Sequence, residues 1–103
     1  MAQDVLVDQD PYEIGHLSSR RHEVAGVEKV GPDGRPIMIV DAVFRERGGP
    51  PEIISVKVPG AVPKLEEYAR IRFVGLRAIY WTMGDRSGLS FRAESVAAVG
   101  AAK

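Results

Sequence analysis

The chain has 103 residues, the length of one domain, and its 45% hydrophobic and 27% charged residues are typical of an ordinary globular protein. It has no cysteine, and His16 and His22 lack the spacing of paired helix ligands, which excludes disulfides and makes a metal site unexpected. No apolar stretch approaches the about 20 residues of a membrane span, so we expect a cytoplasmic protein with no membrane partner.

The formal net charge of zero hides an uneven distribution along the chain. Residues 1–19 contain four acidic and no basic side chains, so residues 20–103, with 14 basic and 10 acidic side chains, carry a charge of +4. Residues 70–92 concentrate this surplus, because they contain a single acid, Asp85, and five arginines: Arg70, Arg72, Arg77, Arg86 and Arg92. Clustered arginines of this kind indicate an anionic partner such as nucleic acid.

Residues 1–19 show neither the period of a strand nor that of a helix, and Pro11 and Gly15 interrupt them. We therefore predict a mobile acidic N-terminal arm over residues 1–19 and a single barrel-like domain over residues 20–103.

Three strands are predicted in the first half of the domain, at residues 22–30, 36–46 and 52–58. Glycine and proline separate them, and residues 31–34 suit a tight turn. The third strand alternates apolar and polar side chains so that Lys57 points outward.

One short helix and two further strands are predicted in the second half. Residues 63–69 have a proline near the start, early acids and good helix formers. Residues 70–82 predict a fourth strand whose inward set changes phase at Gly75, as a β-bulge requires, since Arg77 would otherwise point into the core. After a hairpin loop over residues 83–88, a fifth strand runs to about Val99.

The predicted order, β-β-β-α-β-β, is that of an all-β, five-stranded OB-type barrel, which binds oligonucleotides on the face of its second and third strands. An SH3-like barrel also has five strands and is the alternative fold.

With the bulge at Gly75, the outer faces of the third, fourth and fifth strands carry Lys57, Arg70, Arg72, Arg77, Trp81 and Arg92. Spaced guanidinium groups suit the phosphates of a single strand, and an exposed indole gives an unpaired base a surface to stack on. The alternative is an ordinary solvated face in which Trp81 and Tyr80 close one end of the barrel.

No constellation of residues supports catalysis. Ser18 and Ser19 lie between the two histidines, but that segment is predicted to be mobile and has no oxyanion-hole context. Residues 48–51 lack the lysine and the following helix of a phosphate-binding loop. We expect no enzymatic activity, no cofactor and no small-molecule substrate.

Four short segments carry a family resemblance: residues 34–36 (Gly-Arg-Pro), 54–58 (Ile-Ser-Val-Lys-Val), 68–76 (Tyr-Ala-Arg-Ile-Arg-Phe-Val-Gly-Leu) and 87–91 (Ser-Gly-Leu-Ser-Phe). They resemble the gene V-type helix-destabilising proteins of filamentous phage and related short proteins of actinomycete plasmids and integrative elements. The resemblance implies an OB-type barrel that forms a symmetric dimer and coats single-stranded DNA during replication or transfer of a mobile element.

The resemblance also implies roles for individual residues. Arg35 lies on the hairpin that corresponds to a projecting DNA-binding hairpin of the family, and Lys57 corresponds to a basic residue late in the third strand. The hairpin over residues 81–88, which includes Arg86, is expected to serve dimer contacts as well as DNA. Ile37 stands where the family tends to carry a stacking tyrosine, so that role is expected from Trp81, Tyr80 or Phe44.

The leading hypothesis is therefore a homodimeric single-stranded-DNA-binding protein without catalysis, with RNA as the other ligand the residues allow. The alternative is a protein-interaction or regulatory module of a mobile element, in which Arg77, Trp81 and the acidic arm contact a protein.

Overall fold

The computed structural model describes residues 2–31, 33–60 and 62–99, and in this part of the chain every regular element is a β-strand. The strands are β1 (Ala2–Leu6), β2 (Tyr12–Arg21), β3 (Glu23–Val24), β4 (Val27–Glu28), β5 (Ile37–Glu46), β6 (Pro51–Pro59), β7 (Ile71–Val74), β8 (Arg77–Met83), β9 (Arg86–Arg92) and β10 (Ser95–Ala98). The all-β class predicted from the sequence is confirmed. The described residues include no helix with the length and apolar character needed to cross a membrane.

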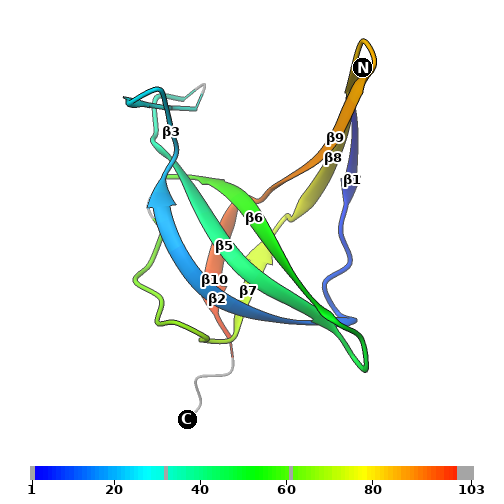
Figure 1. Ribbon diagram of the computed structural model, residues 1–103. Helices are drawn as coiled ribbons and strands as arrows, with labels where there is room; N and C mark the ends of the chain where they lie inside the picture. The colour runs from blue at the N-terminus through cyan, green and yellow to red at the C-terminus, as the bar shows by residue number, and fades with distance from the viewer. Residues whose placement is uncertain (1, 32, 61, 100–103) are drawn as a thin grey trace.

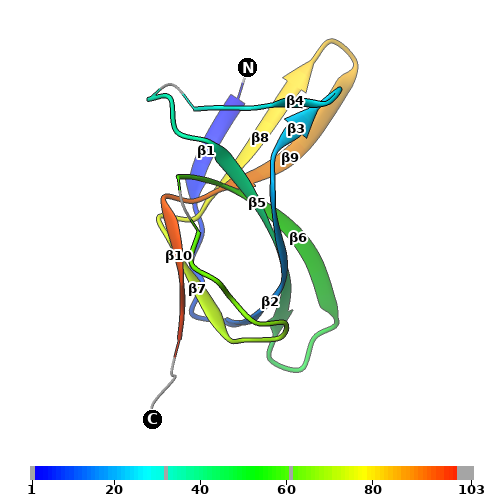
Figure 2. The ribbon, with the colours of Figure 1, turned by 90° about the vertical axis from the view of Figure 1, so that its left-hand side faces the viewer.

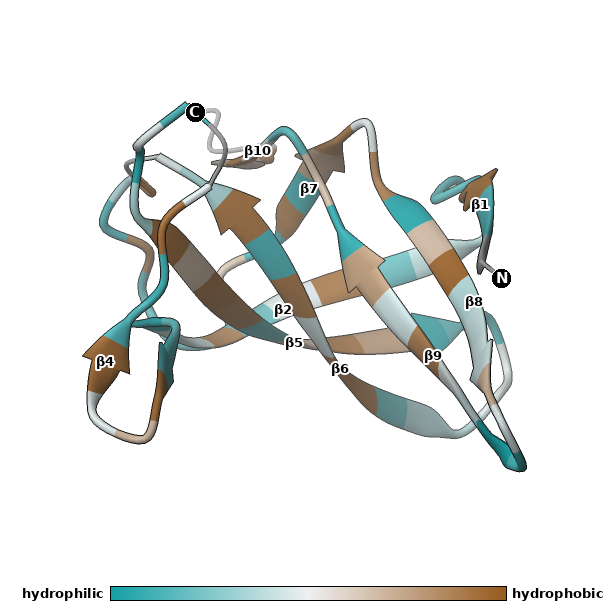
Figure 3. Ribbon diagram, turned by 90° about the horizontal axis from the view of Figure 1, so that it is seen from above, coloured by the Kyte–Doolittle hydropathy of each residue, from teal (hydrophilic) through white to brown (hydrophobic). Residues whose placement is uncertain are grey.

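Six strands form one sheet in the order β1-β8-β9-β6-β5-β2, and two smaller sheets pair β7 with β10 and β3 with β4. The pairings are antiparallel except between β6 and β9, which run parallel. Strands β1, β8 and β9, which we call the wing, project from the core on one side, and the β3–β4 hairpin projects on another (Figure 1). Seen from above, β2, β5, β6, β9 and β8 follow one another across the sheet, and β4 stands apart (Figure 3).

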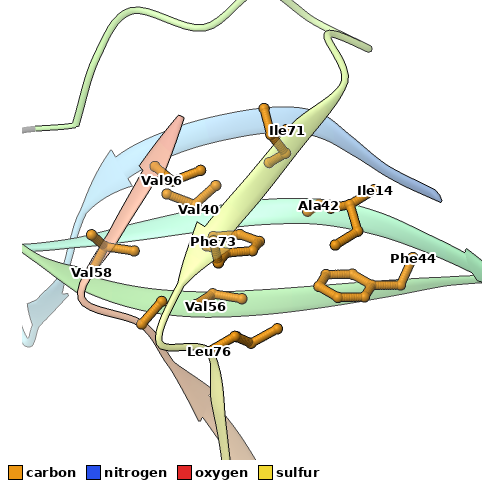
Figure 4. Packing of buried hydrophobic residues seen from close by; sticks show 11 residues of the cluster. Ile14, Val40, Ala42, Phe44, Val56, Val58, Ile71, Phe73, Leu76 and Val96 are labelled. Carbon is orange, nitrogen blue, oxygen red and sulfur yellow. The ribbon is translucent and has the colours of Figure 1, made fainter. Parts of the chain in front are cut away.

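The core lies between the inner face of β2, β5 and β6 and the β7–β10 pair (Figures 2 and 4). Strand alternation places every second side chain of β5 and β6 in it. Within the core the rings of Phe44 and Phe73 stack with their centroids 6.1 Å apart. The buried apolar side chains are Ile14, Val40, Ala42, Phe44, Val56, Val58, Ile71, Phe73, Leu76, Ala93 and Val96.

The sheet curls toward a barrel, but no continuous ladder closes it within the described residues. β2 meets the residue before β7 at a single bridge, between Gly15 and Arg70. Beside it, the buried side chain of Gln9 takes the place of a strand: its Nε2 donates to the Phe73 carbonyl at 2.8 Å, and the Phe73 amide donates to its Oε1 at 2.9 Å. A side-chain amide therefore satisfies backbone groups of β7 that a closed barrel would pair with another strand.

The expectation of a mobile arm over residues 1–19 is wrong, because residues 2–6 form β1 and residues 12–21 form β2. Ile14 and His16 of β2 are buried, so the expected domain boundary at residue 20 falls inside a core strand. The first long strand is therefore β2, and residues 22–30, expected to be that strand, form only the short β3–β4 hairpin. The expected turn over residues 31–34 includes Pro32, which lies outside the described residues.

The helix expected over residues 63–69 does not form. This stretch is too short to overcome the cost of helix nucleation by itself, and β2 supplies its hydrogen-bond partners instead. The Tyr68 amide donates to the His16 carbonyl at 2.6 Å, and Nδ1 of His16 lies 3.1 Å from the Glu66 carbonyl oxygen.

The expected fourth and fifth strands are each divided into two. At Gly75 the chain leaves β7 and, after Leu76, enters β8 in a different sheet, so the glycine marks a break rather than a bulge within one strand. Gly75 has a φ of +63°, and an added Cβ would lie 2.6 Å from Oε2 of Glu94, so only glycine suits the position. The fifth strand is likewise interrupted at Ala93 and Glu94, between β9 and β10.

Candidate nucleic-acid interface

Four cationic side chains lie in one row across the sheet. The pairing register aligns Arg20 of β2 with Ile39 of β5 and Lys57 of β6. It then aligns Lys57 with Arg92 of β9, and Arg92 with Arg77 of β8. Residues opposite each other in register present their side chains on the same face of a sheet. We call Arg20, Lys57, Arg92 and Arg77 the basic row, and its four strand intervals span about 19 Å at about 4.8 Å each.

Three of these cations line a groove of about 520 Å³ between the wing and the segment that leads from the β3–β4 hairpin into β5. Its apolar lining includes Ile37 and Ile79, and one acid, Glu94, also lines it. The groove thus combines cations with apolar surface, which is what a strand of phosphates and bases requires. The lining residues are Gly31, Ile37, Lys57, Pro59, Gly75, Arg77, Ile79, Ser90, Phe91, Arg92, Ala93 and Glu94.

The cations of the row differ in their partners. Arg77 and Arg92 both form ion pairs with Asp4 of β1, at 3.2 Å and 2.8 Å. Arg20 forms an ion pair with Asp41 on the same face. Lys57 forms no ion pair with any described residue, although it lies between two other cations of the row.

The ionisable groups at the β2 end of the row respond to their surroundings. Partial burial lowers the pKa of His22, and the nearby charges of Lys57, Lys29 and Arg20 lower it further. The three cations therefore add to the larger effect of burial, and both disfavour the imidazolium form of His22.

Burial opposes ionisation of the Asp41 carboxyl. Hydrogen bonds from Ser55, Arg20 and Ser18 outweigh that effect and hold the pKa of Asp41 below its ordinary value. Asp41 therefore remains an anion on this face and orients Arg20.

The cations predicted on the third, fourth and fifth strands are only partly brought together. Lys57, Arg77 and Arg92 meet in the groove. Arg70 and Arg72 do not line it, because β7 belongs to another sheet, and they pair with Glu13 at 3.6 Å and Asp10 at 3.0 Å.

The remaining predicted residues lie at other places. Trp81 and Arg86 are on the same face of the β8–β9 hairpin as Arg77, with Arg86 near its tip. Tyr80 is on the opposite face and is 49% exposed. Arg35 lies in the turn before β5, where it pairs with Asp33 and packs near Gly60. Phe44, the third candidate for stacking, is buried in the core.

Trp81 packs across the hairpin onto Gly88, its partner in the register. A Cβ added to Gly88 would lie 2.7 Å from Cε2 of the indole, so the absence of a side chain there makes room for the ring. The indole is half-buried and remains accessible at the end of the face that carries the basic row.

Arg20 and Asp4 belong to this surface but were not predicted as site residues. Both lie in or beside the segment that was interpreted as a mobile arm. Ser18 and Arg20 are two polar residues at alternate positions, which is the pattern of a strand with one face toward solvent. The shift of register between His16 and Ser18 interrupts the alternation and obscures this pattern.

Comparison of the chain with protein-family models, with curated proteins and with solved structures finds no match. The resemblance to gene V-type proteins therefore remains an expectation from short segments of sequence.

Proposed function

We propose that this protein binds single-stranded nucleic acid, DNA in the first instance, along the basic row and without catalysis. The observation that carries the proposal is the alignment of Lys57, Arg92 and Arg77 on three neighbouring strands. Like charges opposite each other destabilise a sheet. Asp4 offsets this cost between Arg92 and Arg77, and an anionic ligand that touches all three cations offsets it between Lys57 and Arg92 as well. At about 3.4 Å per nucleotide the row accommodates at most about six nucleotides, within the about 4–16 of known OB-fold sites.

The strand order supports an OB-type arrangement for this binding site. Strands β2, β5 and β6 form an antiparallel meander, β6 pairs in parallel with β9, and β9 pairs with β8. The bridge between Gly15 and Arg70 brings the first strand of this order next to the start of the fourth. A partly open barrel of this order presents the outer face of its second and third strands, here β5 and β6, to nucleic acid.

The apolar groups on the same face supply the second element of single-strand binding. Ile37 and Ile79 line the groove beside the cations, and Trp81 lies two positions beyond Ile79 on β8. Stacking of a base on an aromatic ring contributes about 1–3 kcal/mol and does not depend on the base. These features favour a protein that coats single strands irrespective of sequence. The short segments similar to gene V-type proteins support a cytoplasmic role in replication or transfer of a plasmid, phage or integrative element.

The test is fluorescence anisotropy of a labelled oligo-dT over a salt series. We expect binding that weakens linearly with the logarithm of salt concentration, and stronger binding to the single strand than to a duplex of the same length. Absence of binding at low salt would contradict the proposal and favour the alternative, a protein-interaction module.

We further propose that the protein is a homodimer joined through the wing. The face of the wing opposite the basic row exposes Val5 (59%), Tyr80 (49%) and Leu89 (58%). An exposed apolar surface of this kind on a small domain suits a two-fold interface made of the same patch on both copies. Sedimentation equilibrium should give twice the 11.2 kDa of one chain, and a monomer at micromolar concentration would contradict the dimer.

A further inference from the structure

The acidic N-terminal segment neutralises the arginines that the sequence concentrates in residues 70–92. Asp4 bridges Arg77 and Arg92, at 3.2 Å and 2.8 Å. Two of the carboxylates that follow it each pair with one arginine, Asp10 with Arg72 and Glu13 with Arg70. Four of the five arginines of that segment thus have an internal carboxylate partner. The opposite charges of the two parts of the sequence are brought together by the fold.

Asp4 differs from the other carboxylates because its partners belong to the groove. It lies opposite Ile79 in the β1–β8 register and therefore on the face that carries the basic row. Its oxygens approach two guanidinium groups at once, from Arg77 on β8 and from Arg92 on β9. Its side chain is still 37% exposed, so it can turn toward solvent without unpairing β1.

We propose that the Asp4 carboxylate occupies the position of a phosphate between Arg77 and Arg92, so that β1 acts as a built-in competitor of the nucleic acid. This inference rests on the proposed function and concerns the regulation of the same site. Carboxylate and phosphate oxygens accept the same charge-assisted hydrogen bonds from guanidinium groups. Two anions cannot share this position, because both would require the same donors and would repel each other.

Competition by Asp4 makes binding depend on the length of the strand. The pairing of β1 with β8 keeps the carboxylate beside its two partners, so a ligand that reaches only Arg77 and Arg92 replaces one anion by another and gains little. A longer strand also contacts Lys57, which has no ion-pair partner among the described residues. The site therefore selects continuous strands over mononucleotides and free phosphate.

Competition also changes the salt dependence. The counterions are condensed on the nucleic acid, and each phosphate that the protein neutralises contributes about 0.7 to the slope of log K against log salt for a single strand. The Asp4 charge beside the two guanidinium groups reduces the net neutralisation of a phosphate that binds there. Removing the Asp4 charge frees two arginines. The slope should therefore become steeper by up to about 0.7, the value for the one phosphate that binds between them.

The experiment compares wild type, Asp4→Asn and Asp8→Asn in binding a labelled oligo-dT of about 12 nucleotides, a length within the range of single-strand sites. Asp8 is the matched control, because it lies in the same segment, forms no ion pair within the described chain, and accepts a hydrogen bond from the Asp10 amide that asparagine can also accept. We expect Asp4→Asn to bind about two- to tenfold more tightly at low salt, the range expected when exposed ion pairs are released. Its slope should be steeper than that of wild type, and Asp8→Asn should change neither quantity comparably.

The outcomes separate the inference from the proposed function. Equal affinity and slope for wild type and Asp4→Asn would overturn the competition and leave single-strand binding intact. An equal gain in Asp8→Asn would overturn it as well, because the effect would then follow net charge alone. Failure of all three proteins to bind would overturn the proposed function and the inference with it. Adding Arg77→Gln to Asp4→Asn should remove most of the gain, and a full gain in the double variant would contradict the bridging position.

Discussion

Replacing Lys57 with glutamine is expected to weaken binding of single-stranded DNA without lowering the free energy of unfolding. Lys57 lies in the basic row next to Arg92, exposed and without an ion-pair partner among the described residues. Like charges directly opposite each other destabilise a sheet, so the substitution relieves repulsion in the free protein. The same substitution removes one phosphate contact from the complex.

The magnitude follows from counterion release. One lost contact lowers the slope of log K against log salt by about 0.7 for a single strand. Between about 50 mM and about 200 mM salt, the affinity ratio of wild type to variant should therefore shrink about 2.6-fold. Thermal unfolding of the free variant should occur at the wild-type temperature or slightly above it.

Fluorescence anisotropy with labelled oligo-dT, repeated over the salt series, measures both quantities. Arg70→Gln is the control, because Arg70 lies outside the groove and has Glu13 as a partner. An unchanged slope in Lys57→Gln, or an equal change in Arg70→Gln, would refute the assignment of the phosphate path to the basic row.

Three further predictions test other parts of the molecule. Trp81→Ala should weaken single-strand binding by about 1–3 kcal/mol with little change in melting temperature. Gly88→Ala should also weaken binding, because the added Cβ would displace the indole. Wild-type affinity in both variants would exclude stacking on this ring. The pKa of His22, lowered by partial burial and by three nearby cations, should rise when a phosphate binds, so the complex takes up protons and affinity increases as the pH falls toward and below the ordinary value of 6.5. An NMR titration of the imidazole with and without oligo-dT checks this, and an identical pKa in both states would place the ligand elsewhere. Gln9→Ala should lower the free energy of unfolding by about 1–3 kcal/mol, because the amide and carbonyl of Phe73 lose their partners; urea unfolding followed by tryptophan fluorescence measures it, and wild-type stability would show that water replaces the side chain.

The strands with a local pattern were predictable from the sequence. β5 and β6 follow the expected ranges closely, since alternation, β-propensity and flanking turn residues all lie within one segment. β2 was missed because only Ile14 and His16 point into the core before the register shifts, which leaves too short an alternating pattern to recognise. The helix propensity of residues 63–69 was overridden because β2 offers that segment hydrogen-bond partners that an isolated short helix lacks.

The sequence by itself determined the charge of each part of the chain and the outward direction of Lys57 on its strand. Only the tertiary structure decided that Lys57, Arg92 and Arg77 stand side by side, because the parallel pairing of β6 with β9 joins segments far apart in the sequence. It also decided that Asp4 lies between two of the arginines, through the pairing of β1 with β8. Alternation is a property of one strand and can be recognised from its local sequence. The register between distant strands depends on which pairing buries the shared core, and the choice of pairing depends on the whole chain.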